Sequence, residues 1–237
     1  MISLKKNPLY AMIDTETIYL KKRVYELAVV VFDSVTCSIV DSKKWYIKET
    51  VESALFYQLR NSKPPVFWPY RLNPFEVLKI AVTWQQALDE FMLTIYKNDV
   101  KSLIAHNINF DISAIYATNN LYGTEYTQDK PFLSSLNKLE LSGYFIHGLP
   151  LMAAYNVPFK QKSGCMTFKA DFLVPCLIGG SQNHDAISDC YNQIELYKIA
   201  IQGGTRYANK GTIYANMLAH HKVKHDDNKR LGNSSLD

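Results

Sequence analysis

The sequence predicts a mixed-sheet α/β domain, and three observations lead to that class. Apolar, β-branched runs crowd the first part of the chain, as in a group of neighbouring strands. After them, strand-like and helix-like segments alternate, which is typical of α/β architecture. The composition of 237 residues, 47% hydrophobic and 20% charged, is that of an ordinary globular protein with room for one sizeable core.

Three closely spaced strands are expected over residues 9–14, 24–32 and 38–47. The first closes on a carboxylate, and the second is almost continuously apolar, as in a central strand. Connections this short favour an antiparallel meander, because parallel strands need a longer crossover. The segment 53–82 carries four prolines and is expected to be mainly loop, with short helical pieces.

The helix that follows has the clearest signal in the chain. Thr83 and Gln86 form a capping-box pattern, and apolar residues from Trp84 to Tyr96 recur at helical spacing and are expected in the core. The later elements are expected as a strand at 102–106, a helix at 110–118, a strand at 143–151, a mixed segment at 156–182, and a helix at 186–202 that stops at Gly203-Gly204.

Composition also excludes several classes of protein. No apolar run approaches the roughly 20 residues that span a bilayer, and the N-terminus lacks the pattern of a secretory signal. The four cysteines form no CxxC pair, which favours reduced, buried thiols over a disulfide framework or a zinc ribbon. The net charge of +4 permits a polyanionic partner without requiring one. We therefore expect a cytoplasmic protein without a membrane partner.

An acidic pair ends the first predicted strand, in the stretch AMIDTETIYL. Asp14 and Glu16 have the same side-chain parity, so both point to one face of the sheet. Two carboxylates this close repel each other, but Mg²⁺ and Mn²⁺ prefer such ligands and turn the repulsion into attraction. The pair by itself fits a solvated strand end equally well.

Two further segments carry candidate ligands. Asp111 falls in the first turn of a predicted helix, where negative charge is favourable in any case, and Asn107 before it is either a turn former or a ligand-facing group. His184 and Asp189 are five residues apart and reach one pocket only if His184 lies on the loop before the helix. Asp185 is the natural N-cap of that helix, not a ligand.

Taken together, these segments resemble a known set of motifs. Asp14-Thr15-Glu16, His106-Asn107-x-x-Phe110-Asp111 and His184-x-Ala186-x-x-Asp189 are similar to the three motifs of the DEDDh, or DnaQ-like, 3′–5′ exonucleases. The resemblance covers roughly residues 9–202 and implies a ribonuclease H-like fold, a mixed five-stranded β-sheet flanked by α-helices. It gives an exonuclease domain over 1–204, with an insertion at about 53–82, and a polar C-terminal tail over 205–237.

The resemblance also implies roles for individual residues. Asp14, Glu16, Asp111 and Asp189 are expected to bind two Mg²⁺ ions, for which Mn²⁺ can substitute, and His184 is expected to be the general base. The implied activity is hydrolysis of phosphodiester bonds from the 3′ end of single-stranded nucleic acid, with release of nucleoside 5′-monophosphates.

Substrate contacts are expected next to these residues, at Thr15, Thr17, Ile18 and Asn107, whereas Phe110 is expected in the core. The stretch 56–72 interleaves aromatic and basic residues, which suits either base stacking with phosphate attraction or packing against the sheet.

DNA is the favoured substrate over RNA, because the compact chain with its own insertion resembles phage replication or recombination nucleases. A phage-encoded chain would act in the host cytoplasm, and a replication or recombination protein is the candidate partner. The glycine that often follows the first motif is replaced by Thr17-Ile18-Tyr19. The alternatives are an exoribonuclease on short or 3′-terminal RNA and a proofreading or interaction subunit of a DNA polymerase.

Overall fold

A computed structural model describes residues 7–18, 22–61, 73–124, 133–142, 169–179 and 184–201. The chain divides into two compact units, one of Met1–Leu141 with Asn183–Ile194 and the other of Ser142–Gln182 with Glu195–Asp237. All of the candidate site residues belong to the first unit. The predicted division into a domain over 1–204 and a tail over 205–237 stays a prediction.

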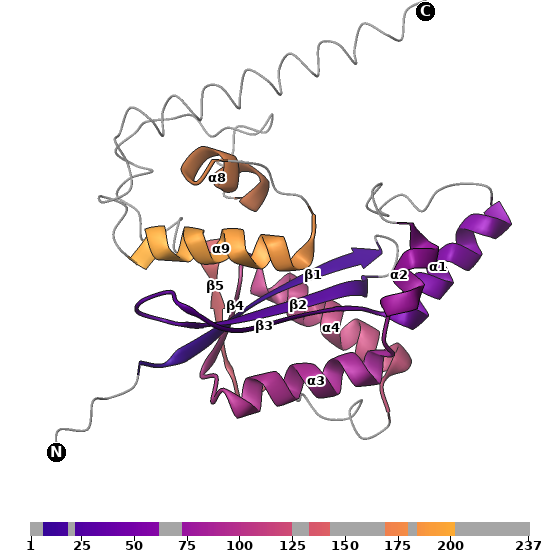
Figure 1. The fold of residues 1–237 in the computed structure, drawn as a ribbon, viewed down its shortest axis with the longest axis horizontal. Coiled ribbons are helices and arrows are strands. Elements are labelled where there is room, and N and C mark those ends of the chain that lie inside the picture. Colours follow the sequence, from indigo (N-terminus) through magenta and orange to yellow (C-terminus); the bar gives the residue numbers. More distant parts are fainter. Residues whose placement is uncertain are drawn as a thin grey trace, which may run out of the picture. The chain divides into compact units, whose positions relative to one another are not determined.

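The first unit is built on a five-stranded sheet in the order β3-β2-β1-β4-β5 (Figure 1). The three N-terminal strands form the expected antiparallel meander, and β4 and β5 extend the sheet in parallel beyond β1. The sheet is therefore mixed, as predicted. Its strands are β1 Leu9–Ile18, β2 Arg23–Asp33, β3 Ile39–Tyr46, β4 Ser102–Ala105 and β5 Asn137–Glu140.

The carboxyl half of β1 has only one strand beside it. β4 pairs with residues 10–12 of β1, while β2 follows β1 along its whole length. A bulge between Glu16 and Thr17 adds local twist near the end of the strand. Within the described residues, the edge of β1 next to Asp14 and Glu16 therefore has no strand beside it, and side chains from other elements can contact it there.

Helices cover both faces of the sheet in the first unit (Figure 1). α3 and α4 share one apolar core with alternate residues of β1 and β2, while the first half of α9 contacts the face that carries Met12. Outside these two layers, α1 and α2 contribute to a smaller cluster around Tyr25. The helices are α1 Lys48–Asn61, α2 Pro74–Ile80, α3 Trp84–Lys97, α4 Ile108–Tyr122 and α9 Ala186–Ile201, the last of which crosses into the second unit.

The predicted capping box of α3 is confirmed. The Thr83 hydroxyl accepts from the Gln86 backbone N–H at 3.2 Å, and the Gln86 side chain accepts from the Thr83 N–H at 3.0 Å. Trp84 and Phe91 on this helix are fully buried, as the helical spacing predicts. Tyr96, at the end of the apolar stripe, is exposed, so its expected place in the core is wrong.

Other expectations need correction. Residues 53–61 complete α1, a helix of 14 residues rather than a short helical piece within a loop, and Val51 and Ala54 are buried on it. The short helix α2 agrees with the helical pieces expected in this segment. The sequence also missed β5, a short polar strand that exists through its pairing with β4. Phe110 is 38% exposed rather than in the core, since it lies on the outer side of the first turn of α4. The strand expected at 143–151 and the tail lie outside the described residues.

Two of the four cysteines are described with their side chains, and both Cys37 and Cys190 are buried thiols outside any disulfide, as expected. In the second unit, α8 spans Ala170–Leu177 and buries Leu173 and Val174. Within the described part of the chain, every helix is too short or too polar to cross a membrane.

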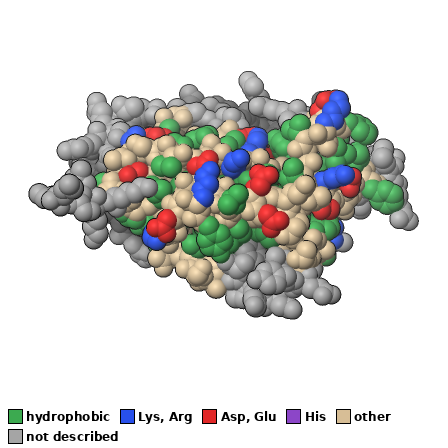
Figure 2. All heavy atoms as spheres, turned by 60° about the horizontal axis from the view of Figure 1, so that its bottom comes forward, with side chains coloured by type: hydrophobic (Ala, Val, Ile, Leu, Met, Phe, Trp, Pro, Cys, Tyr) green, Lys and Arg blue, Asp and Glu red, His purple; other side chains and the backbone are tan. Residues whose placement is uncertain are grey.

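The face of the molecule on the α3 side carries charges of both signs. Figure 2 shows acidic and basic side chains intermingled among apolar ones over its described atoms. Lys97 forms an ion pair with Asp41 at 2.9 Å, and Lys79 forms one with Glu76 at 2.7 Å. Opposite charges therefore alternate over the described part of this face.

Candidate active site

The acidic pair of β1 lies where the strand runs past β4. Asp14 and Glu16 point to the same face, as their parity predicts, and both are only partly buried. Thr15 between them is buried and points to the opposite face. The two carboxylates are therefore presented together at the carboxyl end of the strand.

Asp111 reaches this point from α4. Its Oδ1 accepts hydrogen bonds from the Thr15 backbone N–H at 3.0 Å and from the Thr15 hydroxyl at 2.8 Å. The carboxylate thus takes the place of a neighbouring strand beside the unpaired half of β1. Burial raises the pKa of Asp111 to about 7, even though both bonds from Thr15 favour the ionised form.

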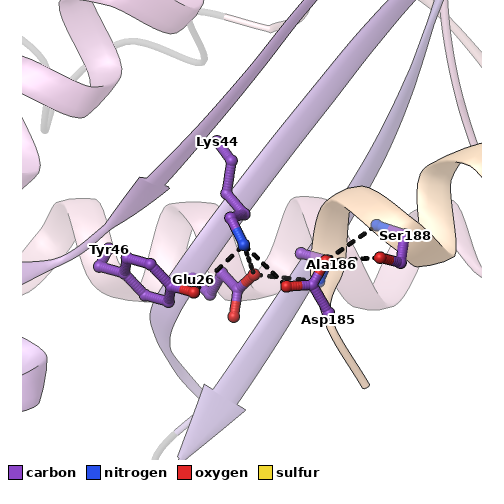
Figure 3. A network of polar contacts seen from close by, with 6 residues as sticks. All are labelled: Glu26, Lys44, Tyr46, Asp185, Ala186 and Ser188. Carbon is purple, nitrogen blue, oxygen red and sulfur yellow. Dashed lines mark hydrogen bonds and ion pairs between the residues drawn. The ribbon is translucent and has the colours of Figure 1, made fainter. Parts of the chain in front are cut away.

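The start of α9 is capped by Asp185, as predicted. Asp185 Oδ1 accepts from the backbone N–H of Ser188 at 3.0 Å and from its hydroxyl at 2.8 Å (Figure 3). The other oxygen, Oδ2, accepts from Lys44 Nζ on β3 at 2.7 Å. One carboxylate therefore caps the helix and ties its first turn to the sheet.

A buried acid on β2 holds the same turn. Glu26 is 1% exposed, and its Oε1 accepts from the Ala186 backbone N–H at 3.1 Å and lies 3.4 Å from Lys44 Nζ (Figure 3). Lys44 also donates to the Tyr46 hydroxyl at 3.1 Å. Burial raises the pKa of Glu26 to about 7, and the ammonium group of Lys44 limits that rise.

These contacts set the position of His184, the residue just before the cap. His184 has a φ of 51°, in the left-handed region that is uncommon for residues other than glycine. Its ring is 66% exposed, and Nδ1 lies 3.9 Å from Glu16 Oε1. His184 is therefore on the loop before α9, as the sequence requires if it is to share a pocket with Asp189.

Asp189 completes the cluster from the first turn of α9, where it is buried. One ligand atom each from Glu16, His184 and Asp189 lie within 4.8 Å of one another. The structure thus brings the first and third sequence motifs to a single point, over a separation of more than 160 residues.

The pKa of Asp14 shows that the four acids lie close enough to repel one another. The pKa of Asp14 lies well above its ordinary value, first because the surrounding protein withdraws its carboxyl group from water, and then because Asp111, Asp189 and Glu16 repel its charge. A carboxylate cluster of this kind needs a positive charge to keep its members ionised. The carboxylate oxygens of this cluster are the ligands that Mg²⁺ and Mn²⁺ prefer.

The predicted substrate-contact residues have different surroundings. Thr15 is buried with its hydroxyl committed to Asp111, whereas Thr17 and Ile18 are partly exposed at the end of β1. Asn107 is exposed, and its side-chain oxygen caps α4 by accepting from the Phe110 N–H at 3.3 Å. Contacts of these residues with a substrate stay predictions.

Three residues of this region escaped the sequence reasoning. Gln193 donates a hydrogen bond to Asp14, while Glu26 and Lys44 form hydrogen bonds with the first residues of α9 and its cap. A signal existed for two of them. Gln193 follows Asp189 by four residues and so shares its helix face, and Glu26 interrupts an otherwise apolar strand. Lys44 has no such signal, because polar residues are ordinary on an edge strand.

Comparison with known proteins shows which solved structures share this fold. No protein-family model and no curated protein matches the chain. Among solved structures, it is similar to E. coli Exonuclease I in complex with a dT13 oligonucleotide, with a TM-score of 0.57 and 15% identity over 84% of this chain. The chain spans 42% of the length of that protein.

Two other similar structures are matched over most of their length. A 3′-exonuclease that recognises the histone mRNA stem-loop gives a TM-score of 0.56 at 16% identity, over 83% of each chain. The nuclease domain of 3′hExo, a DEDDh family member bound to rAMP, gives 0.57 at 16% identity, over 84% of this chain and 94% of that one. The predicted ribonuclease H-like fold is therefore confirmed: the chain has the fold of the DEDDh 3′-exonucleases.

Proposed function

We propose that the protein is a metal-dependent 3′–5′ exonuclease that removes nucleoside 5′-monophosphates from single-stranded nucleic acid. One observation carries the proposal: three other carboxylates, from β1, α4 and α9, crowd around Asp14, and His184 lies at the edge of this cluster. Mutual repulsion makes this arrangement unfavourable for stability by itself, and a site for divalent cations accounts for it.

Each residue has a definite role in the proposed reaction. Asp14, Glu16, Asp111 and Asp189 hold two Mg²⁺ ions, or Mn²⁺ in their place, which when bound activate water and neutralise charge on the phosphate. The exposed imidazole of His184 accepts the proton of the attacking water. Glu16, whose Oε1 is 3.9 Å from Nδ1, stabilises the imidazolium that forms.

Single-stranded DNA is the substrate that we propose first. Exonuclease I, which shares the fold, has been crystallised with dT13 and with dA16 oligonucleotides. RNA is the second candidate, because 3′hExo was crystallised with rAMP and another similar structure recognises a histone mRNA stem-loop. Both substrates present the same phosphodiester to the same acids, so a direct comparison decides between them.

The test is a gel assay with 5′-labelled single-stranded DNA and RNA in Mg²⁺ or Mn²⁺. The wild type should shorten the oligonucleotide stepwise, and a blocked 3′ end should prevent it. Asp14→Ala should reduce the rate by more than about 100-fold, since even residues that only orient metal ligands contribute about 10- to 100-fold. Asp89→Ala, which removes an exposed acid on α3, should leave the rate unchanged.

Thermal denaturation separates a lost function from a lost fold. Without metal, Asp14→Ala should still unfold cooperatively, because the charge repulsion that it relieves offsets the loss of the bond from Gln193 to Asp14. Mn²⁺ should then stabilise the wild type but not the variant. An inert wild type, or cleavage that survives Asp14→Ala, would contradict the proposal.

A further inference from the structure

Gln193 is a buried amide that connects two distant parts of the first unit. Its residue is 1% exposed, and its Nε2 donates to Asp14 Oδ1 at 2.8 Å. Its Oε1 accepts from the backbone N–H of His106 at 2.9 Å. Both ends of the side chain therefore have partners, which lie 179 and 87 residues away in the sequence.

The two bonds link the segments that carry the acids. Asp14 is on β1, His106 begins the turn that leads into α4 and Asp111, and Gln193 itself lies one helical turn after Asp189 on α9. A shift of any one segment would break a bond to this amide. Thr15 provides a second link between β1 and Asp111, but it does not reach α9.

The bond to Asp14 also fixes how that carboxylate is turned. The terminal torsion of an aspartate is broad, so an unrestrained carboxylate samples many orientations. The Nε2 donor on Oδ1 selects one of these orientations. Mutation of a residue that orients a metal ligand in this way typically lowers metal affinity about 10- to 100-fold.

We infer that Gln193 is a positioning residue, which orients the Asp14 carboxylate for divalent cations and holds α9 in register with β1. The inference rests on the proposed function, because orienting Asp14 for cations matters only if the protein uses them. Its test does not, because metal binding is measured without any cleavage.

The test compares Gln193→Met with Asn119→Leu by Mn²⁺ titration, with free Mn²⁺ read by electron paramagnetic resonance. Asn119 is a matched control, because it is also a buried amide at 1% exposure and its side-chain oxygen accepts from Trp84 Nε1 at 3.0 Å. Gln193→Met should weaken Mn²⁺ binding about 10- to 100-fold. Asn119→Leu should leave the Mn²⁺ affinity within about two-fold of the wild type, although both variants lose a buried hydrogen bond.

Equal Mn²⁺ affinity in Gln193→Met and wild type overturns the inference, as does an equal loss of affinity in Asn119→Leu. If Gln193→Met shows no cooperative unfolding, Gln193→Asn takes its place, since the shorter amide cannot span both partners and should also weaken binding. A wild type that binds Mn²⁺ but cuts no oligonucleotide contradicts the exonuclease proposal and leaves the role of Gln193 standing. A wild type that binds no Mn²⁺ contradicts both.

Discussion

Replacing Glu26 with glutamine is expected to remove a pH dependence from the stability of the protein. Glu26 is 1% exposed, and burial raises its pKa from 4.5 to about 7. Asp185 adds to the rise, while Lys44 and the Ala186 N–H oppose it. Between pH 4.5 and 7 the folded protein keeps a proton on this group that the unfolded chain has released, so stability falls as pH rises.

The magnitude follows from the two pKa values. A rise from 4.5 to about 7, at about 1.4 kcal/mol per pH unit, corresponds to about 3 kcal/mol of stability lost by pH 8. Glutamine keeps a side-chain oxygen that can accept from the Ala186 N–H, but it does not titrate. The contributions of Asp14 and Asp111 are common to both proteins and cancel in the difference.

The assay is urea denaturation of wild type and Glu26→Gln from pH 4.5 to pH 8, with a chelator present to remove metal ions. The free energy of unfolding of the wild type should fall by about 3 kcal/mol more than that of the variant. Glu76→Gln, which removes an exposed carboxylate on α2, is the control for loss of one negative charge. A difference between wild type and Glu26→Gln that stays constant across this range would refute the reasoning.

Two further changes test the site and the core. Thr15→Val removes the hydroxyl bond to Asp111 and should raise the pKa of that carboxyl further, so Mn²⁺ titrations near pH 7 should show about 10-fold weaker binding, restored by Thr15→Ser. Binding unchanged in Thr15→Val would exclude this role. Trp84→Phe removes the donor to Asn119 and should lower the free energy of unfolding in urea by about 1–3 kcal/mol or more; unchanged stability would contradict it.

The elements that the sequence predicted well are those that local interactions decide. The capping box of α3 joins Thr83 to Gln86 within one helical turn, and the parity of Asp14 and Glu16 follows from the strand itself. The three-stranded meander follows from short connections between apolar runs. These features depend on neighbours in the sequence, so the sequence alone was enough for them.

Two of the failures, β5 and α1, depend on partners far away in the sequence. β5 is a polar four-residue strand whose neighbour in the sheet is β4, and α1 depends on burial of Val51 and Ala54. Phe110 is exposed for a different reason, because it lies on the outer side of the first turn of α4. Residue type predicts burial only on average.

The sequence by itself determined which residues are available for chemistry: two acids of equal parity on a strand, an acid at a helix start, and a histidine before a helix that carries a fourth acid. Only the tertiary structure decided that they meet. β1 runs past β4, which leaves room for Asp111 at the Thr15 N–H, and Glu26, Lys44 and Asp185 hold the start of α9 beside it. The amide of Gln193, on α9, forms hydrogen bonds with both Asp14 on β1 and His106 before α4. These bonds join residues about 90 to 180 positions apart, and strand order rather than local propensity brings such residues together.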